Sequence, residues 1–424
     1  MTLTGRQGVV IFTAFAFAYF FSALLRAVTA TLAPVFSAEL DLRAADLGLL
    51  AGAYFFGFAA MQLPLGGALD RVGPRRTLLA LLAVAVLGCA AFAVADRLPG
   101  LVAARVMIGA GVAACLMAPL TCYRRLFSPS TQLRTNSWML MTGSFGMLAS
   151  TVPVQWLLPA LGWRGLFWAL AALLVLAMAG IAWGVPPDPR PSAIGPQRTE
   201  DADVTSGAAA AGPAAVHAGY LGIVRHPLFV RMAPLGFFLY GGLIAVQSLW
   251  AGPWLTRVGG WSADQAAQGL FFINLAMLVT FGAWGAVLPR LARHGIGALQ
   301  LMTWGLPLAL ALLFVNVALG GAAGAGPWAL WCVACTFASV SQPALGVAFP
   351  AALAGRALSA YNLVIFGGVF CIQWGIGLLI DGLRALGVVE ASAFRLAFAA
   401  FGVCCVGAYA WFLLHGRAGA DNPH

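Results

Sequence analysis

The chain has 424 residues, of which 62% are hydrophobic and only 8% are charged. A water-soluble domain carries about 25% charged residues, so this composition excludes one. The net charge of +10 comes entirely from arginine, and because the arginines fall mainly in loops between apolar stretches, we expect no nucleic-acid partner. Apolar stretches of about 20 residues, the length that crosses a bilayer, recur throughout. The composition predicts an all-α polytopic membrane protein.

Apolar runs between polar breaks predict about twelve spans. They lie at about 9–33, 46–69, 76–96, 99–122, 136–159, 165–184, 229–253, 266–288, 297–319, 327–350, 357–380 and 394–415. Residues 185–226 between the halves are rich in proline, alanine and glycine, which is typical of a flexible linker. We therefore expect an N-terminal six-helix bundle over 1–184, a cytoplasmic linker over 185–226, and a C-terminal six-helix bundle over 227–424.

Arginine is unevenly divided between the two sets of loops. If the N-terminus is cytoplasmic, most loop arginines lie inside, because cytoplasmic loops of membrane proteins are enriched in them. An even number of spans then places both termini inside. The first apolar run shows no cleavage signal and is expected to be a retained span. These features predict a multi-pass protein of the cell inner (plasma) membrane.

The turn between the second and third spans carries the most specific pattern, Gly-x-x-x-Asp-Arg-x-Gly-x-Arg-Arg. Gly73 can take the positive φ of a tight turn, and Asp70 can accept charge-assisted hydrogen bonds from arginines or a helix N-terminus. The pattern resembles the loop between helices two and three of the major facilitator superfamily of transporters. Its residues are Gly66, Asp70, Arg71, Gly73, Arg75 and Arg76.

Two further segments support this resemblance. Arg105-x-x-x-Gly109-x-Gly111 is similar to the family's fourth-helix signature, and Gly162-Trp163-Arg164 to the usual start of its sixth helix. The resemblance implies that Arg105 and Gly109 act with the Asp70 loop in gating. We expect Asp70 to pair near the cytoplasmic end of the fourth or eleventh span.

The two halves also resemble each other. A shift of about 219 residues places Gly285 to Arg290 over Gly66 to Arg71, with glycine, leucine and arginine retained. The resemblance implies a major facilitator fold of the bacterial twelve-helix type, with two six-helix bundles related by a pseudo-twofold axis. It also implies a monomer in the lipid bilayer, without a cofactor, that moves a small molecule by alternating access through a site between the halves.

Arg26 is the most informative single residue, because a charge well inside a span usually faces a water-filled cavity or a partner. Tyr19, Ser22, Arg26 and Thr29 follow at i, i+3, i+7 and i+10 and so form one stripe on the first helix. This arrangement resembles that of the organophosphate-antiporter branch of the family, and the resemblance implies that Arg26 binds an anionic group. The alternative is an arginine that reaches the interface or caps a neighbouring helix.

The match to that branch is partial, since its second arginine on the seventh helix is replaced here by other polar residues. Polar side chains elsewhere in the spans form a set of hydrogen-bonding groups around Arg26, although each alone also suits helix–helix packing. The predicted substrate-binding set is Arg26, Tyr19, Ser22, Tyr54, Tyr240, Gln247, Asn274, Gln342, Asn362, Gln373 and Trp374.

The sequence predicts a secondary transporter for a small solute, and Arg26 favours an organic anion as that solute. No nucleotide-binding loop, activated nucleophile or metal-ligand cluster is present in the sequence, so we expect neither an enzyme nor a metalloprotein. No acid lies mid-span, which leaves exchange, facilitated diffusion and proton symport open. The alternatives are a multidrug or metabolite efflux pump, a metal-ion importer and a non-transporting sensor. The helix-five signature of drug antiporters is missing.

Overall fold

The computed structural model describes residues 5–187 and 220–417, with the side chains of a few helical residues, Asp70 and Arg125 among them, left undescribed. No strand occurs within these ranges. The first half contains α1 (Gly5–Glu39), α2 (Ala44–Arg71), α3 (Pro74–Val94), α4 (Leu98–Val112), α5 (Ala114–Leu126), α6 (Pro129–Ala149) and α7 (Val152–Gly184).

The second half begins with a seventh span built from several short segments. They are α9 (Pro227–Leu235), α10 (Gly241–Ala245) and α11 (Ala251–Pro253), interrupted by π-helical turns at Gly236–Tyr240, Val246–Trp250 and Trp254–Val258. The remaining helices are α12 (Ala263–Arg293), α13 (Ala298–Leu319), α14 (Ala325–Cys335), α15 (Ser341–Ala348), α16 (Ala351–Ala385) and α17 (Glu390–Arg417).

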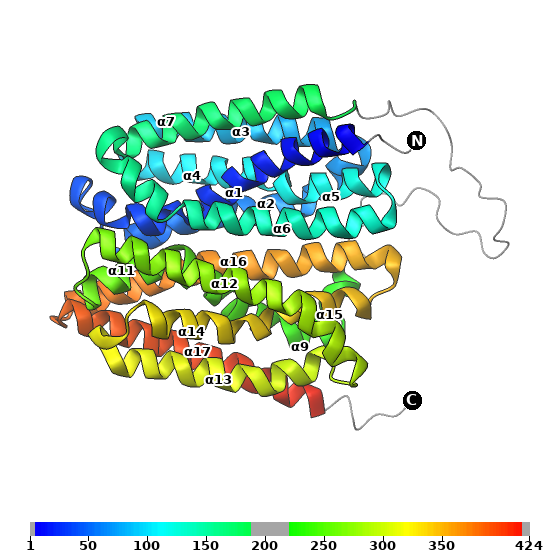
Figure 1. The fold of residues 1–424 in the computed structure, drawn as a ribbon. Coiled ribbons are helices and arrows are strands. Elements are labelled where there is room, and N and C mark those ends of the chain that lie inside the picture. The colour runs from blue at the N-terminus through cyan, green and yellow to red at the C-terminus, as the bar shows by residue number, and fades with distance from the viewer. Residues whose placement is uncertain (1–4, 188–219, 418–424) are drawn as a thin grey trace, which may run out of the picture.

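Eleven helical stretches in the described residues are long and apolar enough to cross a membrane. The 21-residue α6 takes the fifth place in the order and completes the expected twelve. The helices form two bundles, α1–α7 and α9–α17, and the start of α1 and the end of α17 lie at the same end of the molecule (Figure 1). This arrangement confirms the two-bundle, all-α fold.

Spans four and ten break at matching places in the two bundles. Span four divides into α4 and α5 at Ala113, and span ten divides into α14 and α15 at a 3₁₀ turn over Thr336–Val340. Pro119 and Pro343 follow the breaks, and each removes a backbone donor from its helix. The shared interruption reflects the internal repeat.

The fifth span differs from its predicted course. The sequence indicated one uninterrupted span over 136–159, whereas α6 ends at Ala149 and a turn separates it from α7. Within α7 the chain then reverses at Gly162, whose φ of +62° suits glycine. Residues 152–161 therefore extend the fifth span, and the sixth begins at Trp163.

Two boundaries in the second half also differ from expectation. Residues 220–225 are helical although the predicted linker extends to 226, and the predicted linker residues 188–219 lie outside the described part of the chain. α12 ends at Arg293, three residues beyond the position that a 219-residue shift assigns, and Gly295 follows with a positive φ of 78°. α2 ends in the same way, with Arg71 as its last residue and Gly73, also at positive φ, two residues later.

The bundles touch most closely along α2 and α16. A Cβ atom on Gly48 would lie 2.2 Å from the carbonyl oxygen of Gln373, and one on Gly377 would lie 2.3 Å from that of Ala44. Only glycine permits this backbone approach. Both approaches lie towards the end of the molecule where α1 ends and α2 begins, which we call the distal end.

Candidate functional site

Arg26 lies in a cluster of aromatic side chains drawn from both bundles. The hydroxyl groups of Tyr19 and Tyr54 make polar contacts with its guanidinium, and Tyr240 on the seventh span is close enough to interact with it electrostatically. The guanidinium carbon lies 5.7 Å from the ring centre of Phe58. The structure thus brings three of the predicted residues to Arg26 and adds Phe58, which follows Tyr54 by one turn.

Arg26 forms no ion pair within the described residues. Its side chain is half-buried, and its Nε atom is buried without a hydrogen-bond partner. Tyrosine hydroxyls and aromatic faces partly solvate the charge but do not neutralise it. The cluster therefore has a net positive charge at the junction of the two bundles.

Tyr19 approaches Arg26 from its own helix, and Ser22 lies one turn before Arg26 without a recorded role in its contacts with the tyrosines. Tyr19 is held against α6, where a Cβ atom on Gly143 would lie 3.0 Å from the tyrosine hydroxyl. The hydroxyl of Tyr54 donates to the backbone carbonyl of Ser22 at 3.2 Å, and the Ser22 side chain is buried. These contacts fix the predicted stripe on α1 in one orientation.

Arg105 and Gly109 build the wall behind this cluster. Arg105 is 1% exposed and donates to the carbonyl oxygens of Leu25 at 2.9 Å and Leu50 at 3.4 Å, so it joins α1, α2 and α4. Its guanidinium carbon lies 5.1 Å from the ring centre of Tyr54. A Cβ atom on Gly109 would lie 1.9 Å from the Tyr54 carbonyl oxygen. The sequence grouped both residues with the gating loop, whereas the structure places them beside Tyr54.

The π-helical turns of the seventh span carry the site residues of the second bundle. Tyr240 ends the first such turn and Gln247 lies in the second. The Gln247 amide nitrogen donates to Oδ1 of Asn274 on α12 at 2.8 Å. Isolated π-helical turns occur often at functional sites, because they realign the side chains that follow.

The remaining predicted binding residues contact other residues of the second bundle, and among the described residues none of them contacts Arg26. Gln342 donates to Asn362 at 2.6 Å, which pairs spans ten and eleven. Gln373 is fully buried and donates to Ser248 at 3.0 Å inside the second bundle. Trp374 is 37% exposed and packs on Phe370. Their binding roles stay predictions.

The loop between α2 and α3 has the expected turn. Gly73 has a φ of 97°, and Pro74 begins α3. Arg75 donates to the carbonyl of Ala182 near the end of α7, while Arg71 and Arg76 are exposed. No atom outside its own helix lies within 4 Å of a Cβ placed on Gly66. The side chain of Asp70 lies outside the described part of the structure, so its pairing stays a prediction.

The distal end holds polar contacts that sequence reasoning missed. Asp381 at the end of α16 accepts hydrogen bonds from the backbone nitrogens of Ala44 at 3.2 Å and Ala45 at 2.9 Å, across the two bundles. Gln155 donates to Asp264 at 3.0 Å, again between bundles. The position of Asp381 near a span end was visible in the sequence, but its partner was not.

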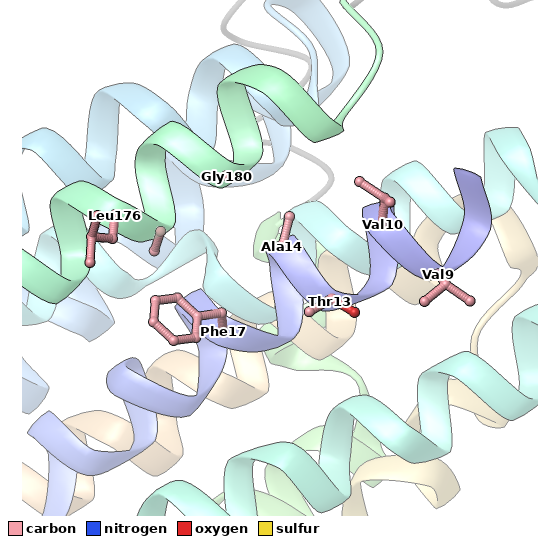
Figure 2. A pocket seen from close by; sticks show the side chains of 8 residues that line it. Val9, Val10, Thr13, Ala14, Phe17, Leu176 and Gly180 are labelled. Carbon is pink, nitrogen blue, oxygen red and sulfur yellow. The ribbon is translucent and has the colours of Figure 1, made fainter. Parts of the chain in front are cut away.

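Among the described residues, neither the groove between α1 and α7 nor a metal-binding cluster offers an alternative site for a charged solute. The groove between α1 and α7 in Figure 2, with a volume of about 380 Å³, has Thr13 as its one polar side chain among lining residues such as Phe17 and Leu176. It therefore lacks groups that would recognise a charged solute. No group of three or more potential metal ligands occurs in the described residues.

Comparison with known proteins places this architecture in a family. The Major Facilitator Superfamily sequence model matches residues 15–372. The inner membrane transport protein YajR of Escherichia coli (strain K12) is 31% identical over 143 residues, a match that spans 33% of this chain and 30% of YajR.

Solved structures resemble the chain over nearly its whole length. A bacterial homologue of the human lysosomal transporter Spinster, in an inward-facing and unoccupied conformation, has a TM-score of 0.73 at 16% identity and covers 98% of both chains. The D-xylose–proton symporter has a TM-score of 0.71 at 17% identity, over 95% of this chain and 97% of its own. With the family match, these shared folds show that the chain is a multi-pass membrane protein and a member of the major facilitator superfamily of transporters.

Proposed function

We propose that this protein is a secondary transporter that moves a small organic anion by alternating access, with Arg26 as the group that binds the anion. The observation that supports this most directly is an arginine among Tyr19, Tyr54 and Tyr240, at the junction of the bundles and without an acidic partner among the described residues. A charge within a span raises the free energy of the protein when no opposite charge neutralises it. An anion that binds Arg26 neutralises this charge and so stabilises the site.

The chemistry of the cluster suits a carboxylate or a phosphate. A guanidinium presents a planar fork of donors that matches two oxygens of such a group. The tyrosine hydroxyls add donors from both bundles, so an anion held by Arg26 and Tyr240 draws the bundles together. Neutralising the charge also favours closure of the site around the substrate, which is the step that alternating access requires.

The topology of the protein completes the proposal. Because the loop arginines are concentrated at the end of the α2–α3 turn, we assign that end to the cytoplasm and the distal end to the opposite side. Both termini are then cytoplasmic, and the protein is a monomer of the cell inner membrane. The contacts of Asp381 and Asp264 close the distal end in this conformation.

The test is binding and uptake of a panel of carboxylates and phosphates by purified protein in proteoliposomes. Arg26→Lys keeps the charge but loses the donor fork, so we expect partial activity, whereas Arg26→Ala loses nearly all. Arg231→Lys is the matched control, because Arg231 also lies within a span but contacts Phe412 on α17. Wild-type transport by Arg26→Ala, or a preference for cations or for solutes without an anionic group, would contradict the proposal.

A further inference from the structure

The side-chain amide of Gln247 has only one orientation that satisfies its neighbours. The backbone carbonyl of Leu270 can only accept, so the Asn274 amide nitrogen faces it, at 3.0 Å. That orientation leaves Asn274 Oδ1 as the acceptor for the Gln247 amide nitrogen, at 2.8 Å. Gln247 Oε1 is therefore directed away from Asn274, and it accepts no hydrogen bond from the described residues.

Gln247 lies along the same seam between the bundles as Arg26. Tyr240, seven residues earlier on the seventh span, interacts with Arg26. Gly252, five residues later, packs on α1 so closely that a Cβ atom there would lie 2.5 Å from the carbonyl oxygen of Ala30. Gln247 falls between these two contacts, and its side chain is half-buried.

We propose that Gln247 Oε1 accepts a hydrogen bond from the substrate, which therefore carries a hydroxyl or ammonium donor in addition to its anionic group. This inference rests on the proposed function of Arg26 and specifies the substrate class further. The anionic group binds Arg26 in the first bundle, and the donor binds Gln247 in the second. A substrate with both groups links the bundles, whereas a simple anion binds only one of them.

The hydrogen bond from Gln247 to Asn274 makes this site selective for a ligand that carries a hydrogen-bond donor. A free glutamine side chain can rotate by half a turn and present either a donor or an acceptor. Because the nitrogen is held by Asn274, the oxygen of Gln247 stays on the side away from Asn274 and cannot exchange places with the nitrogen. A ligand without a donor then leaves a partly desolvated acceptor unpaired, and sites built in this way reject the analogue that lacks the group. Because Gln247 is only half-buried, we expect a preference of about tenfold in Kd, far below the value for a sealed pocket.

The experiment compares ligands that differ only in the donor. The probes are lactate, alanine and propionate, together with glycerol 3-phosphate and propyl phosphate, and the readout is their Kd for purified full-length protein. Lactate against alanine separates a hydroxyl from an ammonium donor. We expect wild type to bind the donor-bearing member of at least one series about tenfold more tightly.

Two variants test the assignment to Gln247. Gln247→Leu removes the acceptor and should bring the paired ligands to equal affinity while Arg26-dependent binding persists. Asn274→Leu frees the amide to rotate and should reduce the preference several-fold. Gln300→Ala, a surface glutamine that caps α13 in the same bundle, is the control and should keep the wild-type preference.

The outcomes separate this inference from the proposed function. If no anion in the panel binds in an Arg26-dependent way, the proposed function fails. If anions bind through Arg26 but paired ligands bind wild type equally, or if Gln247→Leu keeps the preference, only the role of Gln247 is wrong. Thermal unfolding of each variant identifies any that has not folded, and Gln247→Met then serves as a less disruptive second variant.

Discussion

Removing the carboxylate of Asp381 should shift the protein towards a conformation that is open at the distal end. Asp381 accepts two backbone hydrogen bonds, at 3.2 Å and 2.9 Å, from the first turn of α2 in the other bundle. The first backbone N–H groups of a helix have no partner within that helix, and its N-terminus has a partial positive charge. We therefore expect the Asp381 carboxylate to act as a latch, a contact that stabilises only the conformation that is closed at the distal end.

The size of the effect follows from these contacts. A partly buried carboxylate at a helix N-terminus contributes up to about 2 kcal/mol. Asp381 is only half-buried, so solvent weakens the interaction and about 1–2 kcal/mol is the expected contribution to the closed conformation. That range corresponds to a change of about 5- to 30-fold in the ratio of open to closed molecules for Asp381→Ala. Asp381→Asn keeps one acceptor oxygen and should shift the ratio less.

The assay is a distance distribution between spin labels on the two bundles at the distal end. Arg97→Cys and Leu386→Cys provide exposed attachment sites on the α3–α4 and α16–α17 loops. The exposed native thiols Cys371 and Cys404 are first replaced by serine. Asp381→Ala should enlarge the population at long distances relative to the parent protein.

Asp46 provides the matched control. Its carboxylate accepts from the backbone nitrogen of Arg43 at 3.1 Å, at the same helix end, but within one bundle. Asp46→Ala removes an acid and a cap from α2 without breaking a contact between bundles, so the distances should stay those of the parent. An unchanged distribution for Asp381→Ala, or an equal shift for Asp46→Ala, would refute the latch.

Two further predictions concern the first bundle. Gly109→Ala should lower the free energy of unfolding by about 1–3 kcal/mol, because the new methyl group would lie 1.9 Å from the carbonyl oxygen of Tyr54. Gly66→Ala is the control: its methyl group meets no atom of another element within 4 Å, so its free energy of unfolding should stay within about 0.5 kcal/mol of wild type. Both values are measured by unfolding in detergent. Equal losses for the two variants would contradict the packing argument. Asp70→Asn should slow turnover and shift the population towards the inward-facing state with expression intact, and unchanged transport together with unchanged cysteine accessibility would show that Asp70 has no part in gating.

Much of the architecture was predictable because the bilayer imposes it. A span must be about 20 apolar residues long, and arginines collect in the loops, so the number of spans and their order follow from the sequence. The turn at Gly73 was predictable for a similar local reason, since a short turn between two helices favours positive φ. Arg26 stood out because a charge inside a span requires a local explanation.

The surroundings of these residues depended on how the helices pack. Most spans are apolar on every face, so helical periodicity does not show which side of a helix meets its neighbours. Gln247 and Gln373 are both single glutamines within apolar spans, so the sequence does not distinguish them. In the structure the oxygen of Gln247 is directed away from Asn274, whereas Gln373 is buried against Ser248. Asp381 lies 336 residues from Ala45, so only the approach of α16 to α2 turns it into a cap. The sequence by itself determined the spans, their order and the position of Arg26 well inside the first of them. Tertiary structure alone decided which polar groups surround that charge, because those contacts join helices that are distant in the chain.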